Sequence, residues 1–174
     1  MPRTDSGEYR ELFAGARADL EWVAERANAH GVKALVELHH ETITPSASAA
    51  MRLIEGLDPG AIGVIHDLGN LVIEGAERNE SAFELLGPYL AHVHVKNVRW
   101  VTEATDAHGS REWHHEWASL ADGQADVYAY LVALVRHGYN GWITVEDFST
   151  DLPLEERTAG NLALLRDALR EARG

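Results

Sequence analysis

Apolar positions along this chain switch repeatedly between helical and strand-like spacing. Between Glu8 and His30 they recur every three or four residues, which predicts an amphipathic helix. Gly31 follows, at the position where a glycine commonly ends a helix. The next nine residues, VKALVELHH (32–40), form a short β-rich run that is typical of a buried strand.

The same alternation returns three more times. We expect further strands at residues 61–67 (AIGVIHD), 91–97 (AHVHVKN) and 141–148 (GWITVEDF). Further helices are expected over residues 46–57, 77–90, 126–137 and 154–172. Helices that alternate with nearly continuous apolar strands predict an α/β fold with a parallel sheet. We expect four strands and about five helices in a single domain, residues 1–174.

The loops after the expected strands are long and polar, whereas those before them are short. In parallel α/β folds the functional residues gather at the carboxyl ends of the strands. Residues 99–123 form the longest of these polar stretches. We expect this stretch to be a loop that covers the site.

Each expected strand ends in a side chain that can bind a metal ion: Glu37, Asp67, His94 and Glu146. Their separations are 30, 27 and 52 residues, the last enlarged by the long polar stretch. One βα unit takes roughly 30 residues, so the four recur once per strand. Parallel neighbouring strands place such residues at the same end of a sheet, and we therefore expect them to converge.

Composition narrows the chemistry of this site. The chain has 174 residues and no cysteine, which excludes thiolate metal ligands and a disulfide framework. Three carboxylates and one imidazole favour Mn²⁺, with Mg²⁺, Co²⁺ and Zn²⁺ as alternatives. Three ionised carboxylates this close would repel one another strongly without a cation between them, which is itself an argument for a metal ion.

The charge balance bears on partners. Fifteen basic and 28 acidic residues give a net charge of -13, the opposite of what a phosphate-backbone binder needs, so nucleic acid is not an expected partner. The first ten residues lack the apolar run of a signal peptide. No window approaches the roughly 18 apolar residues of a membrane-spanning helix. We expect a cytoplasmic protein without a membrane partner.

Each site residue also has an ordinary structural interpretation. Asp67, followed by the residues LGN, can form an Asx-turn. His92 and His94 can be hydrogen-bonded core histidines, and the pair Glu146-Asp147 can be surface charge. Four coincident strand-end ligands favour the metal site over these interpretations taken together.

Four runs of the chain, VELHHETIT, GVIHDLGN, HVHVKN and GYNGWITVEDF, carry a family resemblance. They resemble the last four strands of the sugar phosphate isomerase/epimerase family, which has the xylose isomerase-like TIM barrel fold. The resemblance covers about residues 10–169. It implies that the family's metal ligands fall on Glu37, Asp67, His94 and Glu146, and that the chain is a parallel (β/α) half-barrel equivalent to strands 5–8.

The chain departs from the family's usual pattern in two positions and in length. Asn70 stands where many members have a histidine, and Lys96-Asn97 stands where many read Lys-Asp. A complete (β/α)₈ barrel takes about 250 residues, so the resemblance implies that strands one to four are absent from residues 1–174. The two outer strands are then open edges, and we expect them to pair with a second copy, as a homodimer, or with a missing N-terminal half.

The resemblance implies isomerisation or epimerisation of a small sugar or keto-polyol through an enediolate. Glu37 and Glu146 are expected as the catalytic proton-transferring pair, while Asp67 and His94 mainly hold the ion. The residues expected to contact substrate are His39, Asn70 and Lys96; for His39 a structural role is the alternative.

Two other classes of function stay open. One is a metal-dependent phosphodiesterase of the endonuclease IV kind, which the charge of -13 disfavours. The other is a non-catalytic half-barrel that binds metal but lacks half of the site.

Overall fold

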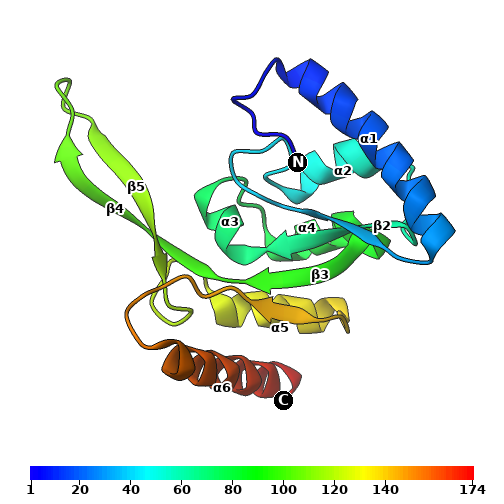
Figure 1. The fold of residues 1–174 in the computed structure, drawn as a ribbon. Coiled ribbons are helices and arrows are strands. Elements are labelled where there is room, and N and C mark those ends of the chain that lie inside the picture. Colours follow the sequence, from blue (N-terminus) through cyan, green and yellow to red (C-terminus); the bar gives the residue numbers. More distant parts are fainter.

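The computed structural model describes residues 1–174, apart from the side chain of Glu103. Its centre is a parallel four-stranded sheet in the order β1-β2-β3-β6 (Figure 1). The strands are β1 (Ala34–Glu37), β2 (Ile62–Asp67), β3 (Leu90–Val95) and β6 (Ile143–Val145). The α/β class with a parallel sheet is therefore confirmed, and the first and last of the four expected strands are the two edges.

The helices fall at the expected places, with shifted ends. They are α1 (Tyr9–His30), α2 (Ala47–Ile54), α4 (Asn79–Leu86), α5 (Val127–His137) and α6 (Leu154–Arg173). A further short helix, α3 (Leu68–Ile73), follows β2 directly and was not expected. The helix expected over 77–90 stops at Leu86, because Gly87 and the proline after it form the 3₁₀ turn η1 (Gly87–Tyr89).

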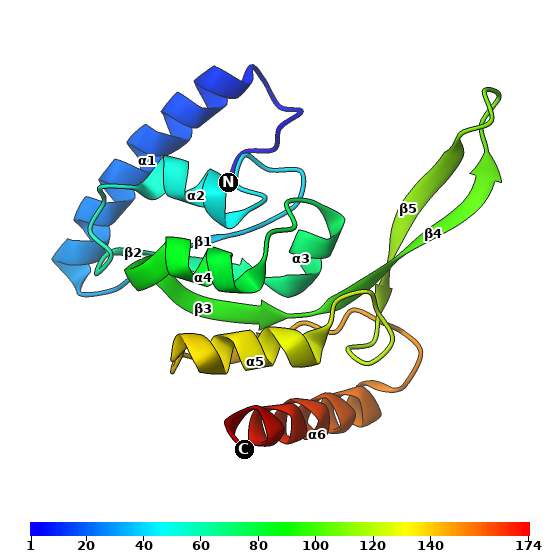
Figure 2. The same cartoon turned by 180° about the vertical axis from the view of Figure 1, so that it is seen from behind.

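One face of the sheet is covered by helices and the other is open. Along the chain, α1 contacts α2, α2 contacts α4, α4 contacts α5 and α5 contacts α6, so the helices form one row (Figures 1 and 2). Val36, Val64 and Val93 alternate into the core beneath that row and are buried. On the opposite face Leu35 is 40% exposed and Ile65 is half-buried, as expected for side chains that point away from the helices.

His66 belongs to the helix-covered core. Its Nδ1 lies 2.8 Å from the hydroxyl oxygen of Tyr130, and its ring packs against Phe83. Burial lowers the pKa of His66 to about 3, so the imidazole is neutral at pH 7. His66 is thus a core histidine of the kind that the sequence interpretation considered for His92 and His94, although its Nε2 is buried without a hydrogen-bond partner.

The prediction of a loop over residues 99–123 is wrong. Most of it is an antiparallel hairpin, β4 (Asn97–Thr105) and β5 (Arg111–Ala118), which projects from the carboxyl end of the sheet (Figure 1). Its turn is held by Asp106, whose Oδ1 accepts hydrogen bonds from the backbone N–H groups of His108 and Ser110, each at 2.8 Å. Aromatic and polar residues alternate along β5 (WHHEW, 113–117) with period two, a strand signal that the polarity of the segment obscured.

Asn97 anchors the base of the hairpin. Its amide nitrogen donates to the carbonyl oxygens of Leu120 and Ala125, and its Oδ1 accepts from the backbone N–H of Val98 and Ala125. The residue is 1% exposed, so the asparagine that departs from the family pattern has a structural role here. Asn97 therefore connects the base of the hairpin to the segment that leads into α5.

Candidate metal centre

Four side chains meet at the carboxyl end of the sheet. Glu37 ends β1, Asp67 ends β2, His94 lies one residue before the end of β3, and Glu146 directly follows β6. One ligand atom from each lies within 4.8 Å of all the others. The register explains this, because Asp67 pairs with His94 and the strands run parallel. The predicted convergence is therefore confirmed.

His94 lies at the centre of the cluster. Its Nδ1 is 3.4 Å from Glu37 Oε1, 3.4 Å from Asp67 Oδ2 and 3.3 Å from Glu146 Oε1. The neighbouring carboxylates of Asp67 and Glu37 outweigh burial and raise the pKa of His94 to about 9. The metal-free imidazole is therefore protonated at pH 7. The adjacent His94 in turn lowers the pKa of Glu37.

Asp67 has the capping role that the sequence suggested, and one of its oxygens faces the cluster. Its Oδ1 accepts from the backbone N–H of Asn70 at 2.8 Å and so caps the start of α3. Its Oδ2 faces His94 and Lys96 instead. Since the side chain is 0% exposed, the cap fixes its rotamer and leaves one oxygen for a cation.

Lys96 is a member of the cluster. Its Nζ lies 2.9 Å from Asp67 Oδ2, 2.9 Å from Glu146 Oε2 and 4.0 Å from Glu37 Oε1, and its side chain is 4% exposed. Burial lowers the pKa of Lys96, but the charges of Asp67 and Glu146 outweigh burial and raise the pKa above its ordinary value. In the metal-free protein the ammonium group therefore faces carboxylates, where the sequence interpretation expected substrate oxygens.

Asn70 contacts Glu37. Its Nδ2 donates to Glu37 Oε1 at 3.3 Å and to the Leu38 carbonyl at 3.0 Å, while its Oδ1 accepts from His40 Nδ1 at 3.0 Å. The asparagine is 0% exposed, so it orients the Glu37 carboxylate from behind. His40 was missed in the sequence interpretation; its place, three residues after a strand-end ligand, was the available signal.

His39 and His92 lie at the border of the cluster. His39 stacks on His40 with ring centroids 4.3 Å apart, and its Nδ1 lies 2.8 Å from the His40 carbonyl. That contact matches the structural alternative for His39. His92 lies 2.8 Å from the hydroxyl of Thr144 and packs edge-on against His94, on the open face of the sheet.

The ligand set suits a divalent cation. Asp67 Oδ2 and His94 Nδ1 are buried and no hydrogen bond satisfies either atom, although the Lys96 ammonium lies 2.9 Å from Asp67 Oδ2. A cation bound among the four side chains would satisfy both atoms, and buried polar atoms without such a partner are costly. Three carboxylate oxygens and one imidazole nitrogen match the preferences of hard or borderline ions. Glu37, Asp67, His94 and Glu146 could hold such an ion.

Binding of a metal ion to this cluster is expected to depend on pH through His94. The imidazole must lose its proton to become a ligand, and its pKa of about 9 means that the proton is present below that pH. Affinity for Mn²⁺ should therefore rise about tenfold per pH unit between pH 6 and 8, and level off above about pH 9. Titration calorimetry in buffers of different ionisation enthalpy measures the released proton. A pH-independent affinity would contradict this expectation.

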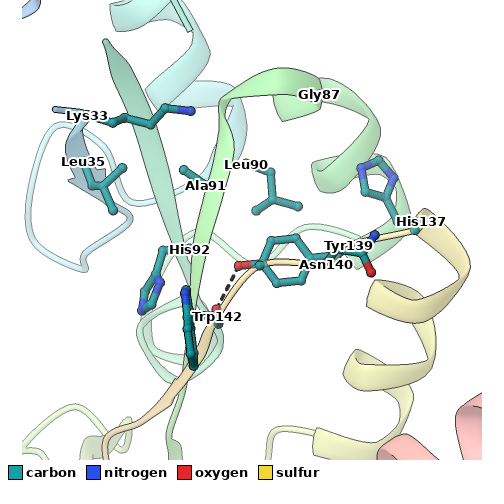
Figure 3. Close-up of a pocket in the computed structure, with 12 residues that line it drawn as sticks. Lys33, Leu35, Gly87, Leu90, Ala91, His92, His137, Tyr139, Asn140 and Trp142 are labelled. Atoms are coloured by element: carbon teal, nitrogen blue, oxygen red, sulfur yellow. Dashed lines mark hydrogen bonds between the residues drawn. The ribbon is translucent and has the colours of Figure 1, made fainter. Parts of the chain in front are cut away.

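Another hollow lies away from the cluster. A cavity of about 610 Å³ opens near the amino ends of β1, β3 and β6, between Lys33, Leu35, Tyr139 and Trp142 (Figure 3). The hydroxyl of Tyr139 donates to the Trp142 carbonyl at 2.8 Å and braces its wall. Function in parallel α/β folds lies at the carboxyl ends of the strands, so this hollow belongs to the open face and not to the metal centre.

A smaller hollow borders the cluster. It has a volume of about 430 Å³, and Glu37, His39 and Thr42 are among the residues that line it. That volume falls within the range of small-molecule sites.

No described helix is long and apolar enough to cross a membrane.

Comparison with known proteins agrees with this geometry. Residues 2–168 match the sequence model of the xylose isomerase-like TIM barrel family. Inosose dehydratase from Salmonella typhimurium is 27% identical over 153 residues, which are 83% of this chain and 48% of the relative. The inosose dehydratase of Bacillus licheniformis is 28% identical over 145 residues, with 80% and 46% covered. The chain thus spans about half the length of the curated relatives it matches.

Solved structures show the same fold. A xylose isomerase-like TIM barrel protein from Mycobacterium smegmatis, in complex with magnesium, superposes with a TM-score of 0.70 at 22% identity, over 92% of this chain and 52% of that one. A D-tagatose 3-epimerase-like protein gives a TM-score of 0.73 at 18% identity, over 99% and 60%.

Proposed function

The chain belongs to the xylose isomerase-like TIM barrel family, and on that premise we propose that it is a metal-dependent isomerase or epimerase. Its substrate is a small sugar, keto-polyol or related compound. The observation that carries the proposal is the convergence of Glu37, Asp67, His94 and Glu146 within 4.8 Å. The similarity to an inosose dehydratase and to a D-tagatose 3-epimerase-like protein supports the substrate class.

Exposure separates the roles within the cluster. The side chains of Glu37 and Glu146 are 33% and 26% exposed, whereas those of Asp67 and His94 are 0% and 13% exposed. The two glutamates are therefore more accessible to a substrate, and the two less exposed residues are better placed to hold the ion. This difference supports Glu37 and Glu146 as the proton-transferring pair.

The reaction needs one group to remove a proton and another to return it. One glutamate removes the proton from the carbon beside the carbonyl, which produces an enediolate. In an epimerisation the other glutamate returns a proton to the opposite face of the same carbon. In an isomerisation a proton is delivered to the former carbonyl carbon, while the proton of the neighbouring hydroxyl moves to the former carbonyl oxygen. The bound ion supplies the positive charge that stabilises the enediolate oxygens. Asn70 holds Glu37 in place through its 3.3 Å hydrogen bond. His39 borders the hollow next to Glu37 and is in reach of a substrate hydroxyl.

Mn²⁺ is the ion that we propose, with Mg²⁺, Co²⁺ and Zn²⁺ as alternatives. Carboxylate-rich sites with one imidazole suit Mn²⁺ because it accepts both oxygen and nitrogen ligands. Titration of the metal-free protein with each ion in turn ranks them directly.

Solvent exchange tests the proposed chemistry without knowledge of the substrate. The protein, loaded with Mn²⁺, is incubated in D₂O with a panel of ketoses and keto-inositols and then analysed by NMR. Proton transfer through an enediolate introduces deuterium beside the carbonyl carbon. Metal binding without exchange in any compound would instead favour the non-catalytic alternative. Cleavage of abasic-site DNA would favour a phosphodiesterase, which the charge of -13 opposes.

We further propose that residues 1–174 are one domain that supplies strands 5–8 of the family barrel, and that two copies close the barrel as a homodimer. The open face and the unpaired edges β1 and β6 support this. Trp142, beside β6, is 83% exposed, and with Leu35 it lines the hollow in Figure 3. Unpaired edges and exposed apolar side chains favour association.

The homodimer makes a measurable prediction. Closing the barrel would bury on the order of 2,000 Å² in total, within the range of stable dimers. Sedimentation equilibrium at micromolar concentration should therefore give twice the mass of 19.2 kDa. Exchange of Trp142 for aspartate should shift the protein toward monomer, whereas the same exchange at Trp22, exposed on α1, should not. A monomer with a cooperative melt would contradict the homodimer.

A further inference from the structure

Lys96 contacts the same oxygen atoms that the metal ion needs. Its ammonium group lies 2.9 Å from Asp67 Oδ2 and 2.9 Å from Glu146 Oε2. Asp67 Oδ1 is already used as the helix cap, so Oδ2 is the oxygen of Asp67 that is free for an ion. An ammonium group and a divalent ion cannot both lie against this oxygen without strong repulsion, because two like charges about 4 Å apart repel appreciably even at an intermediate dielectric constant.

The fold makes room for the lysine in this position. At Gly69, in α3, an added Cβ would overlap Lys96 Cγ and would lie 3.1 Å from the Lys96 carbonyl oxygen. Only glycine therefore lets the aliphatic part of Lys96 pass between α3 and the cluster. The side chain is 4% exposed, so solvent does not stabilise its charge.

Two aromatic rings lie on another side of the ammonium group. The Nζ of Lys96 is 5.5 Å from the ring centroid of Trp117, on β5, and 5.6 Å from that of Phe148. The two rings lie 5.2 Å apart. The two distances from Nζ to the ring centroids fall within the range of a cation–π contact. The rings therefore offer the ammonium group a second favourable position when it leaves the carboxylates.

We propose that Lys96 is a built-in competitor of the divalent ion. It neutralises Asp67 and Glu146 in the metal-free protein, and it withdraws toward Trp117 and Phe148 when an ion binds. The inference rests on the proposed metal site and adds a control on its affinity: the ion must displace a bound positive charge. A divalent ion can do so more readily than a monovalent one, which excludes Na⁺ and K⁺ from the cluster.

The chain offers a matched test because it has two lysines, Lys33 and Lys96. Lys96→Met keeps the length of the aliphatic part and removes the charge. Lys33→Met makes the same change in net charge at the amino end of the sheet, beside the hollow of Figure 3. We expect Lys96→Met to bind Mn²⁺ roughly tenfold or more tighter than the wild type, by electron paramagnetic resonance titration at pH 8. Lys33→Met should bind as the wild type does.

Each outcome decides between the two proposals. If the wild type binds Mn²⁺ and Lys96→Met binds it equally well or more weakly, the proposal that Lys96 competes with the ion is overturned. The proposed metal site is then unaffected. Absence of binding in both proteins overturns the metal site and the competitor together. If Lys96→Met folds only when Mn²⁺ is present, the ion has replaced the ammonium group and the proposal is supported. If it stays unfolded with Mn²⁺ as well, the proposal is wrong.

Lysine labelled with ¹³C at Cε provides an independent readout on the wild type. Two signals are expected, and Lys33→Met assigns them. Addition of Mg²⁺, which is diamagnetic, should move the Lys96 signal upfield as Cε and Nζ approach the faces of the rings, and should leave the Lys33 signal in place. A stationary Lys96 signal at saturating Mg²⁺ would show that the ammonium group does not move.

Discussion

Exchange of Asp67 for asparagine is expected to weaken Mn²⁺ binding by about 100-fold or more. The side chain is 0% exposed, and its Oδ2 faces both His94 and Lys96. Asparagine keeps the shape and can still cap α3, since asparagine is among the preferred capping residues. It removes the negative charge that a buried cation requires, and even changes to supporting residues cost 10- to 100-fold in metal affinity.

The control for this variant is Asp19→Asn, an exposed position on α1. Titration calorimetry gives the affinity of each protein, and circular dichroism verifies that the α3 cap and the fold survive. If Asp67→Asn bound Mn²⁺ within a few-fold of the wild type, Asp67 would have only its capping role. The ion would then have to be placed elsewhere.

Exchange of Glu146 for glutamine is expected to lower turnover by about 1,000-fold, with a smaller effect on the fold. Loss of a positioned acid–base group typically costs 10²- to 10⁴-fold, and glutamine cannot accept or return a proton. Glu146 lies directly beyond β6 and is 26% exposed, so it faces the open mouth of the cluster. Its partner in proton transfer, Glu37, remains in this variant.

The measurement is the rate of deuterium incorporation at saturating Mn²⁺, so that a weakened metal affinity does not imitate a lost proton transfer. Glu55→Gln, at the exposed end of α2, serves as the control for the replacement of a glutamate carboxylate by an amide. Near-normal rates in Glu146→Gln would remove this residue from the catalytic pair. The proton transfer would then have to be assigned to another group near Glu37.

The candidate centre was predictable because its four residues follow from two simple regularities. Strand ends recur once per βα unit, and parallel strands present their carboxyl ends together. Glu37 and Asp67 could therefore be placed from spacing alone, and the pairing of Asp67 with His94 confirms the register. The metal chemistry that we assign to them remains a proposal.

The sequence interpretation missed features that depend on the path of a side chain through the fold, or that lie in segments whose polar residues hide the strand or helix pattern. The β4–β5 hairpin was interpreted as a loop because its exposed residues are polar, although Trp113 and Trp117 alternate with them at strand spacing. The helix α3 has six residues, too few for a clear helical period. The position of the Lys96 ammonium depends on its passage over Gly69, which no periodicity encodes.

All four side chains of the candidate centre come from neighbouring parallel strands of one sheet, within residues 37–146. A chimaeric protein that contains this segment would therefore keep all four side chains of the centre. Grafting different companion strands onto β1 and β6 would change the walls that face a substrate while the ligand register stayed as it is. A library of such fusions, selected on different sugars, would separate the evolution of specificity from the evolution of the chemistry.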